Sequence, residues 1–247
     1  MPESFALTHW LNQLFGGILA AGIHAVGVPA DKASAQASAI LSAFSLEVLV
    51  VCGLIAFFIV VRLTLSVERP NPAQHIAEML HEVIGDQAEQ VIGHGYQRFQ
   101  AYVTCIFLFV LLNNLVGLIP GITAPTASIT VTLGLASLTF LYYNFHGIRA
   151  QGPVGYLKHF AGPIWWMAWL IFPIEIISDL ARIMSLSVRL YANMYAGDLV
   201  TLAFFSLIPI GVPAIFLGLH VLISVIQAFV FMLLTMIYLS LAVSHEH

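Results

Sequence analysis

The sequence predicts an all-α polytopic membrane protein, with about five membrane helices and one amphipathic helix. Hydrophobic residues make up 60% of the chain and charged residues only 8%, whereas a soluble domain is roughly one quarter charged. The apolar runs are long and show no period-2 alternation, which favours helices over a β-barrel. The composition argues against a soluble enzyme, and the net charge of −4 argues against a nucleic-acid binder, which needs a basic surface.

Five apolar runs are the expected spans. They cover about residues 40–61, 99–119, 127–145, 163–209 and 213–243. The fourth holds about 44 helical residues, or ~66 Å, against a hydrocarbon core of ~30 Å. We therefore expect it to be broken or strongly tilted, with Pro173 and Gly197 as possible kinks.

Two further segments lie outside these runs. Residues 1–39 are only weakly apolar and lack the basic start of a signal peptide, so we expect an extracytoplasmic or interfacial segment before a single membrane domain at 40–247. Segment 72–92 combines apolar residues at helical spacing with an acidic face. This pattern predicts an amphipathic helix on the cytoplasmic side, lying on the membrane or on a partner.

The positive charges predict the orientation. Five of the eight basic residues fall in the loops after the first and third spans. They are Arg62, Arg69, Arg98, Arg149 and Lys158. Because cytoplasmic loops carry the excess of Lys and Arg, we expect the N-terminus outside and the C-terminus in the cytoplasm.

Ionisable residues at membrane depth are costly and are functional candidates. The fourth run carries Glu175, Asp179, Arg182, Arg189 and Asp198. On a helix with ~100° per residue, the first four share a narrow stripe with Ser178, Ser185 and Asn193, whereas Asp198 lies on the opposite face. Arginine stays charged and cannot carry a proton, but it can attract a carboxylate.

The fifth run offers Asp198 a partner. His220 titrates near neutral pH and shares a helix face with Ser224 and Gln227. A short turn joins the two runs, so we expect Asp198 and His220 to meet in the outer half of the membrane. Each residue also has a structural alternative: an ion pair of Arg182 with either acid, a satisfied core histidine, or a glutamine that joins helices.

No metal or cofactor is expected. Both cysteines lie in apolar runs, which argues against a disulfide framework or a cysteine metal site. His81-Glu82 begins like a zinc-protease HExxH motif, but Gly85 occupies the position of the second histidine.

The string SLSVRLYANMYAGDL, followed by HVLISVIQAFVFMLLTMIYLSLA, resembles subunit a of the F-type ATP synthase. The resemblance covers roughly residues 40–247. It implies a stator subunit of a rotary proton motor in the bacterial inner membrane, which is not an enzyme by itself. Its long tilted helix hairpin, about 164–243, would pack along the ring of c subunits. The other implied partners are the b subunits of the peripheral stalk and the soluble ATPase head, and the implied ion is H⁺ rather than Na⁺.

The resemblance also assigns roles to residues. The essential arginine that faces each c-subunit carboxylate falls on Arg189, with Asn193 beside it. Glu175 falls on the inner half-channel, Asp198 and His220 on the outer one, and Gln227 on the neighbouring helix. This chain has aspartate at 198 where glutamate is frequent and glycine at 117 where some members carry an acid. Arg182 stands where some members have lysine, which preserves the charge, and no family role transfers to Asp179.

Two alternatives remain open from the sequence. One is an independent secondary transporter in which Arg189 binds an anionic solute, although no internal repeat is found. The other is a membrane scaffold without transport, in which the buried charges are structural.

Overall fold

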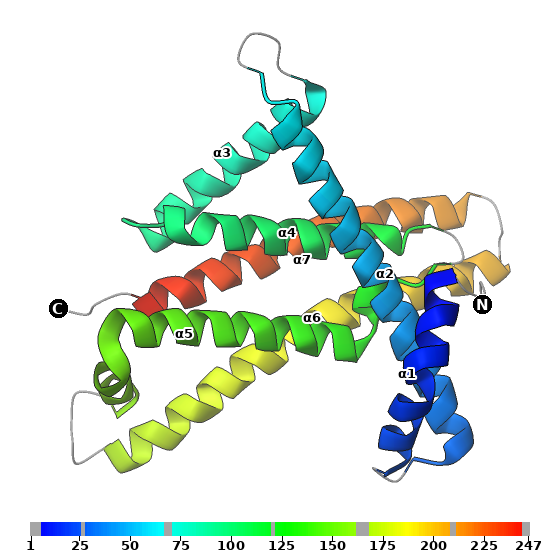
Figure 1. Ribbon diagram of the computed structural model, residues 1–247, viewed down its shortest axis with the longest axis horizontal. Helices are drawn as coiled ribbons and strands as arrows, with labels where there is room; N and C mark the ends of the chain where they lie inside the picture. Colours follow the sequence, from blue (N-terminus) through cyan, green and yellow to red (C-terminus); the bar gives the residue numbers. More distant parts are fainter. Residues whose placement is uncertain are drawn as a thin grey trace. The chain divides into compact units, whose positions relative to one another are not determined.

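The computed structural model describes residues 6–25, 28–66, 71–119, 122–161, 168–207 and 211–243. Every regular element in these ranges is helical (Figure 1). The elements are α1 (Ala6–Ala25), α2 (Ala30–Leu63), α3 (Pro72–Ile92), α4 (Gln97–Val116), the 3-10 turn η1 (Pro125–Ala127), α5 (Ile129–Ala161), α6 (Ala168–Leu207) and α7 (Val212–Val243). The all-α prediction is confirmed.

Three helical segments are long and apolar enough to cross a membrane: Lys32–Leu63, Gln97–Val116 and Pro213–Val243. They correspond to the first, second and fifth expected spans. The third and fourth lie in α5 and α6, in which polar or charged residues recur along the helix. The expected limits at residues 163 and 209, and Arg69, fall outside the described residues.

Two helices differ from their expected limits. α2 begins at Ala30, well before residue 40, because the alanine-rich stretch before the apolar run is itself a strong helix former. α5 continues to Ala161 but contains Gly152 at φ 75°, a non-helical conformation that changes its course and that glycine adopts without steric cost. α3 covers residues Pro72–Ile92 as predicted.

The chain forms two compact units. Unit 1 comprises Met1–Leu63, Phe109–Val131 and Tyr191–Ser224, and unit 2 comprises Thr64–Leu108, Thr132–Leu190 and Val225–His247. Four helices, α4 to α7, each contribute one part to unit 1 and the other part to unit 2.

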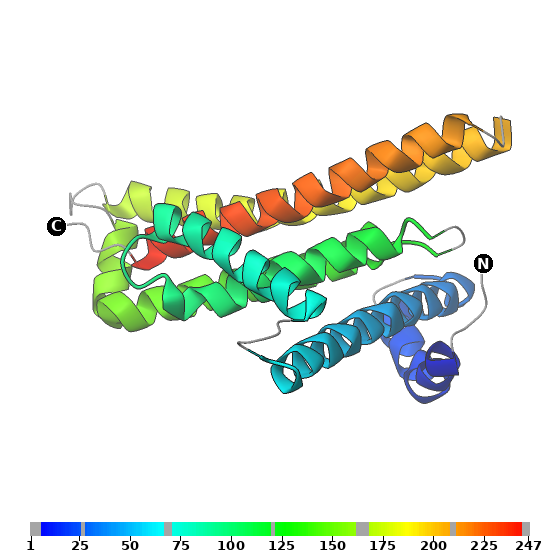
Figure 2. The ribbon, with the colours of Figure 1, turned by 90° about the horizontal axis from the view of Figure 1, so that it is seen from above.

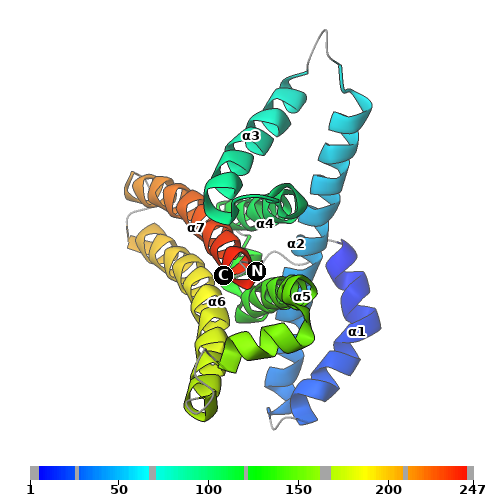
Figure 3. The same ribbon diagram turned by 90° about the vertical axis from the view of Figure 1, so that its left-hand side faces the viewer.

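In unit 1, α1 lies along the N-terminal part of α2 (Figures 1 and 3). A hydrogen bond of 2.7 Å joins the hydroxyls of Thr8 and Ser45, and the small side chains of Ala33 and Ala37 are buried. The end of α6 and the start of α7 run antiparallel and side by side in the same unit (Figure 2). This pairing positions Asp198 and His220.

In unit 2, the core joins α3, α4, α5 and α7. Its fully or almost fully buried members are Ile84, Ala88, Phe99, Val103, Tyr143, Met232, Met236, Leu239 and Ala242. The Tyr102 and Tyr142 rings stack with centroids 3.6 Å apart and tie α4 to α5. The amphipathic α3 therefore packs on other helices through one face, while Ile76, Met79 and Val83 remain exposed.

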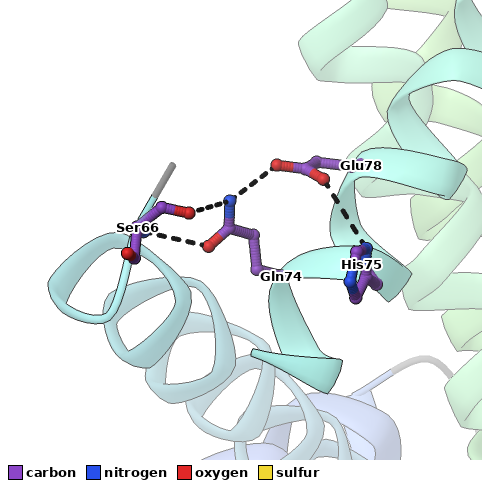
Figure 4. Close-up of polar contacts among 4 residues, drawn as sticks. All are labelled: Ser66, Gln74, His75 and Glu78. Atoms are coloured by element: carbon purple, nitrogen blue, oxygen red, sulfur yellow. Dashed lines mark hydrogen bonds and ion pairs between the residues drawn. The ribbon is translucent and has the colours of Figure 1, made fainter. Parts of the chain in front are cut away.

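A polar contact fixes the start of α3 in unit 2 (Figure 4). The Gln74 side chain accepts a hydrogen bond from the Ser66 backbone N–H at 3.1 Å and donates one to the Ser66 carbonyl at 3.2 Å. Gln74 also donates to Glu78 at 2.7 Å, and His75 lies 4.0 Å from the same carboxylate. Gln74 thus holds the backbone of Ser66 against the start of α3.

The long fourth run is one continuous helix. α6 spans 40 residues with Pro173 inside it, which corresponds to ~60 Å. The sequence predicts that this run is either broken or strongly tilted, and α6 contains no break. Gly197 does not interrupt the helix and is not among the glycines with positive φ; its contact with another helix is described below.

Candidate functional site

Unit 2 holds a cluster of three charged side chains on α6. Arg182 Nη1 lies 2.8 Å from Asp179 Oδ1, and Arg182 Nη2 lies 3.8 Å from Glu175 Oε1. The guanidinium carbon also lies 5.6 Å from the centre of the Tyr238 ring on α7, within the range of a cation–π contact. Arg182 therefore forms the ion pairs that the sequence offered as its structural alternative, with both Asp179 and Glu175.

The two acids of this cluster differ in burial. The side chain of Asp179 is 8% exposed, whereas that of Glu175 is 35% exposed and that of Arg182 is 30% exposed. Tyr143 of α5 lies beside this cluster, where it lines the same small space as Arg182 and Tyr238. Tyr143 was not predicted as a site residue, because only its packing against the α6 stripe makes it one.

Arg189 lies seven residues after Arg182 on the same helix, but its surroundings are different. It is exposed, as is Ser185, and none of the residues that the structure describes forms an ion pair with it. The opposite side of this turn is buried: Leu190 is fully buried, and Ser187 donates to the Thr132 hydroxyl of α5 at 3.1 Å. α6 therefore turns an unpaired guanidinium away from unit 2.

The remaining predicted residues fall on both units. Asn193 in unit 1 is exposed one helical turn beyond Arg189, as the stripe requires. Gln227 in unit 2 is 3% exposed, so it faces the interior of the unit.

Unit 1 brings Asp198 and His220 together, as the short turn predicts. His220 Nδ1 lies 4.0 Å from Asp198 Oδ1, which is an ion-pair distance for a protonated histidine but too long for a direct hydrogen bond. His220 is 3% exposed. Asp198 Oδ2 and His220 Nε2 are buried without a hydrogen-bond partner among the described residues. Because both atoms have unused hydrogen-bonding capacity, they suit a bridging water or an exchanging proton.

Gly197 explains how His220 comes so close to α6. A Cβ atom at this position would lie 2.8 Å from both Cε1 and Nε2 of the imidazole. Only a residue without a side chain allows this approach.

A buried polar network of unit 1 was not predicted, apart from Ser224. Thr126 donates to Asn114 Oδ1 at 2.7 Å, and Asn114 Nδ2 donates to the Ser224 carbonyl at 3.3 Å. The Ser224 hydroxyl lies 3.9 Å from Met194 Sδ. The adjacent asparagines of α4 were the available signal, since a buried amide in an apolar run needs partners.

Known proteins identify the family of this chain. The ATP synthase A chain family matches it over residues 43–240. The chain belongs to this family. ATP synthase subunit a of Koribacter versatilis is 47% identical to it over 247 residues, which is the whole of both chains. The Solibacter usitatus protein of the same name is 46% identical over 203 residues, 82% of this chain and 87% of that one. The resemblance drawn from the two sequence strings is confirmed.

Together with its apolar helices, membership of the ATP synthase A chain family identifies the chain as a polytopic membrane protein. The family match covers all ten predicted site residues, from Glu175 to Gln227. Among the described residues, no group of His, Cys, Asp and Glu could hold a metal ion.

Proposed function

We propose that this chain is the proton-conducting stator subunit in the membrane sector of an F-type ATP synthase. The observation that carries the proposal is Arg189, an exposed arginine without an ion-pair partner among the described residues, on a helix that carries acids on both sides of it. An unpaired permanent charge at membrane depth is costly. A carboxylate supplied by another subunit would compensate it.

The proton would enter from the outside through Asp198 and His220. From there it neutralises a carboxylate of the c-subunit ring, and the neutral carboxyl group can face lipid as the ring turns. After nearly a full turn, the proton leaves toward the cytoplasm in the region of Glu175 and Asp179. The histidine suits the first step because its charge changes near neutral pH.

Arg189 would separate these two half-channels. It attracts the ionised carboxylate, and because it keeps its own proton throughout the accessible pH range, it blocks direct passage of a proton between the two sides. Asn193 and Ser185 would flank this position on the same stripe, and Ser224 and Gln227 would support it from the next helix. Each proton that crosses contributes ~2.3 kcal/mol per 100 mV of membrane potential.

The remaining proposals follow the same assignment. The chain acts as one subunit of the complex and has no catalysis of its own; its partners are the c ring, the b subunits and the soluble ATPase head. It lies in the bacterial inner membrane with its N-terminus outside, carries H⁺ rather than Na⁺, and needs no cofactor.

The decisive experiment replaces Arg189 by alanine in the intact complex. We expect ATP-driven proton pumping into inverted membrane vesicles to be abolished, while the chain remains inserted at wild-type level. Arg189→Lys should also fail if the planar guanidinium is required. Arg149→Ala, the same change at an exposed arginine of α5, is the matched control and should pump normally.

Three outcomes would overturn the proposal. Normal pumping by Arg189→Ala would remove its central residue. Solute uptake by the purified chain alone in liposomes would favour the secondary transporter. A scaffold would be indicated if the chain did not purify with a c ring and an ATPase head, and if its membrane charges tolerated apolar replacement.

A further inference from the structure

We infer that Asp179 is a positioning residue: its carboxylate holds Arg182 beside Glu175, the residue to which the proposed function gives the exchange of protons. The inference rests on the proposed function and divides its inner half-channel into two roles. Sequence position alone treats the two acids alike, since they lie four residues apart on one stripe.

The first argument is access. A proton-exchanging group must be accessible, and the Glu175 side chain is 35% exposed at the surface of this chain, whereas that of Asp179 is 8% exposed. The exposed large side chains that flank this part of α6 include Ile174, Ile176, Ile177 and Leu180. Asp179 therefore points into unit 2, and Glu175 lies at its edge.

The second argument is how tightly each acid is held. Asp179 accepts a charge-assisted hydrogen bond from Arg182 at 2.8 Å. Glu175 has only the longer contact of 3.8 Å with the same guanidinium. Short bonds to an ionised group stabilise its charge, so Asp179 compensates Arg182 while Glu175 is only loosely held.

The third argument is the charge around Glu175. Among the residues that the structure describes, the charged and titratable groups packed around the cluster are Asp179 and Arg182 of α6, Tyr143 of α5 and Tyr238 of α7. The two tyrosines are neutral at physiological pH, so the charges of Arg182 and Asp179 cancel beside Glu175. Tyr238 holds the guanidinium on its other side through the ring contact. Glu175 can then gain and lose a proton without an excess of either sign next to it.

The test measures how ATP-driven pumping depends on the pH outside inverted vesicles. Asp179→Asn leaves Arg182 uncompensated, and a nearby cation favours the ionised form of a carboxylate. Proton uptake through Glu175 should then fail at lower pH than in the wild type. We expect the alkaline limb of the profile to move down by about one pH unit, which is roughly tenfold less pumping at a fixed alkaline pH.

The double variant Asp179→Asn with Arg182→Gln restores zero net charge beside Glu175. We expect its alkaline limb to return to within a few tenths of a pH unit of the wild type, by the charge argument above. Replacing a buried ion pair as a pair is usually tolerated, whereas removing one partner is not. Immunoblots of the membranes show whether each variant chain is inserted.

A second readout is independent of pumping. A carbodiimide reacts with protonated, accessible carboxyl groups, and mass spectrometry of this chain locates the adduct. Over a pH series we expect labelling at Glu175 and none at Asp179. Arg189→Ala is measured in parallel, because normal pumping by that variant refutes the proposed function without affecting either the labelling or the pH shift.

Three results would overturn the inference. Complete loss of pumping at every pH in both the single and the double variant, with wild-type amounts of inserted chain, would make Asp179 a proton carrier. A partial, pH-independent loss that is equal in both and matched by less inserted chain would reduce the pair to a structural role. Carbodiimide labelling of Asp179 in the wild type would show that it exchanges protons.

Discussion

The two acid clusters of α6 differ in the partner that each carboxylate meets. In unit 2 the partner is an arginine, at 2.8 Å from Asp179 and 3.8 Å from Glu175. In unit 1 the partner of Asp198 is a buried histidine from α7, at 4.0 Å. Arginine holds a permanent charge and a fixed geometry, whereas histidine gains and loses charge near neutral pH.

The packing around the two clusters also differs, because it holds Arg182 more firmly than His220. Arg182 comes from the same helix as its acids and is held further by the Tyr238 ring. His220 comes from another helix and depends on the space left by Gly197, and its Nε2 has no partner among the described residues. The unit 2 cluster therefore suits positioning of charge, and the unit 1 cluster suits exchange of a proton.

His220→Ala tests the exchanging cluster and should have the largest effect of the variants discussed below. Loss of the titratable group that α7 places beside Asp198 should lower ATP-driven proton flux by roughly tenfold, or ~1.4 kcal/mol in barrier height. Flux should not vanish, because Asp198 and water remain. The measurement is the initial rate of vesicle acidification across a pH series; a flux equal to wild type at every pH would remove the relay role.

Gly197→Ala tests the same cluster with the histidine still present. The added methyl group would lie 2.8 Å from the imidazole, so the ring must move away from Asp198 or α7 must shift. Overpacking of this kind costs about 1–3 kcal/mol. We expect a several-fold loss of proton flux and a lower melting temperature of the purified complex.

Gly218→Ala is the matched control for this change. Gly218 lies on α7 two residues before His220, and an added Cβ there meets no atom within 4 Å. Since alanine is the better helix former by about 1 kcal/mol, this variant should be as stable as the wild type or more so, with normal flux. If both glycine variants lost flux equally, the close approach of His220 would not be the cause.

Much of this contrast could be predicted from the sequence. The charges within an apolar run indicated that α6 carries the functional residues. Helical spacing correctly placed Glu175, Asp179 and Arg182 on one face. Amphipathic spacing predicted the limits of α3 because its apolar positions recur at the helical period. The meeting of Asp198 and His220 followed from the short connection between two long helices.

Other features depended on contacts that spacing does not encode. The difference in burial between Glu175 and Asp179 arises from the neighbouring helices, including Tyr143 of α5. The sequence indicates Gly197 only as a possible kink, whereas the structure shows that its missing side chain leaves room for an imidazole on another helix. Both cases require knowledge of which side chains pack across helices.

Thr126→Val tests whether the exchanging cluster includes the polar network of unit 1, and its expected effect is the smallest. Valine keeps the shape but removes the donor to Asn114 Oδ1, a bond of 2.7 Å between fully buried groups. Loss of one buried partner costs about 1–3 kcal/mol, so the melting temperature should fall while proton flux stays within twofold of wild type. The network shares unit 1 with His220 but contains no group that titrates near neutral pH, which is why stability and flux should separate. If flux fell as far as in His220→Ala, the proton path in unit 1 would extend through Asn114, and an aspartate–histidine pair alone would no longer describe it.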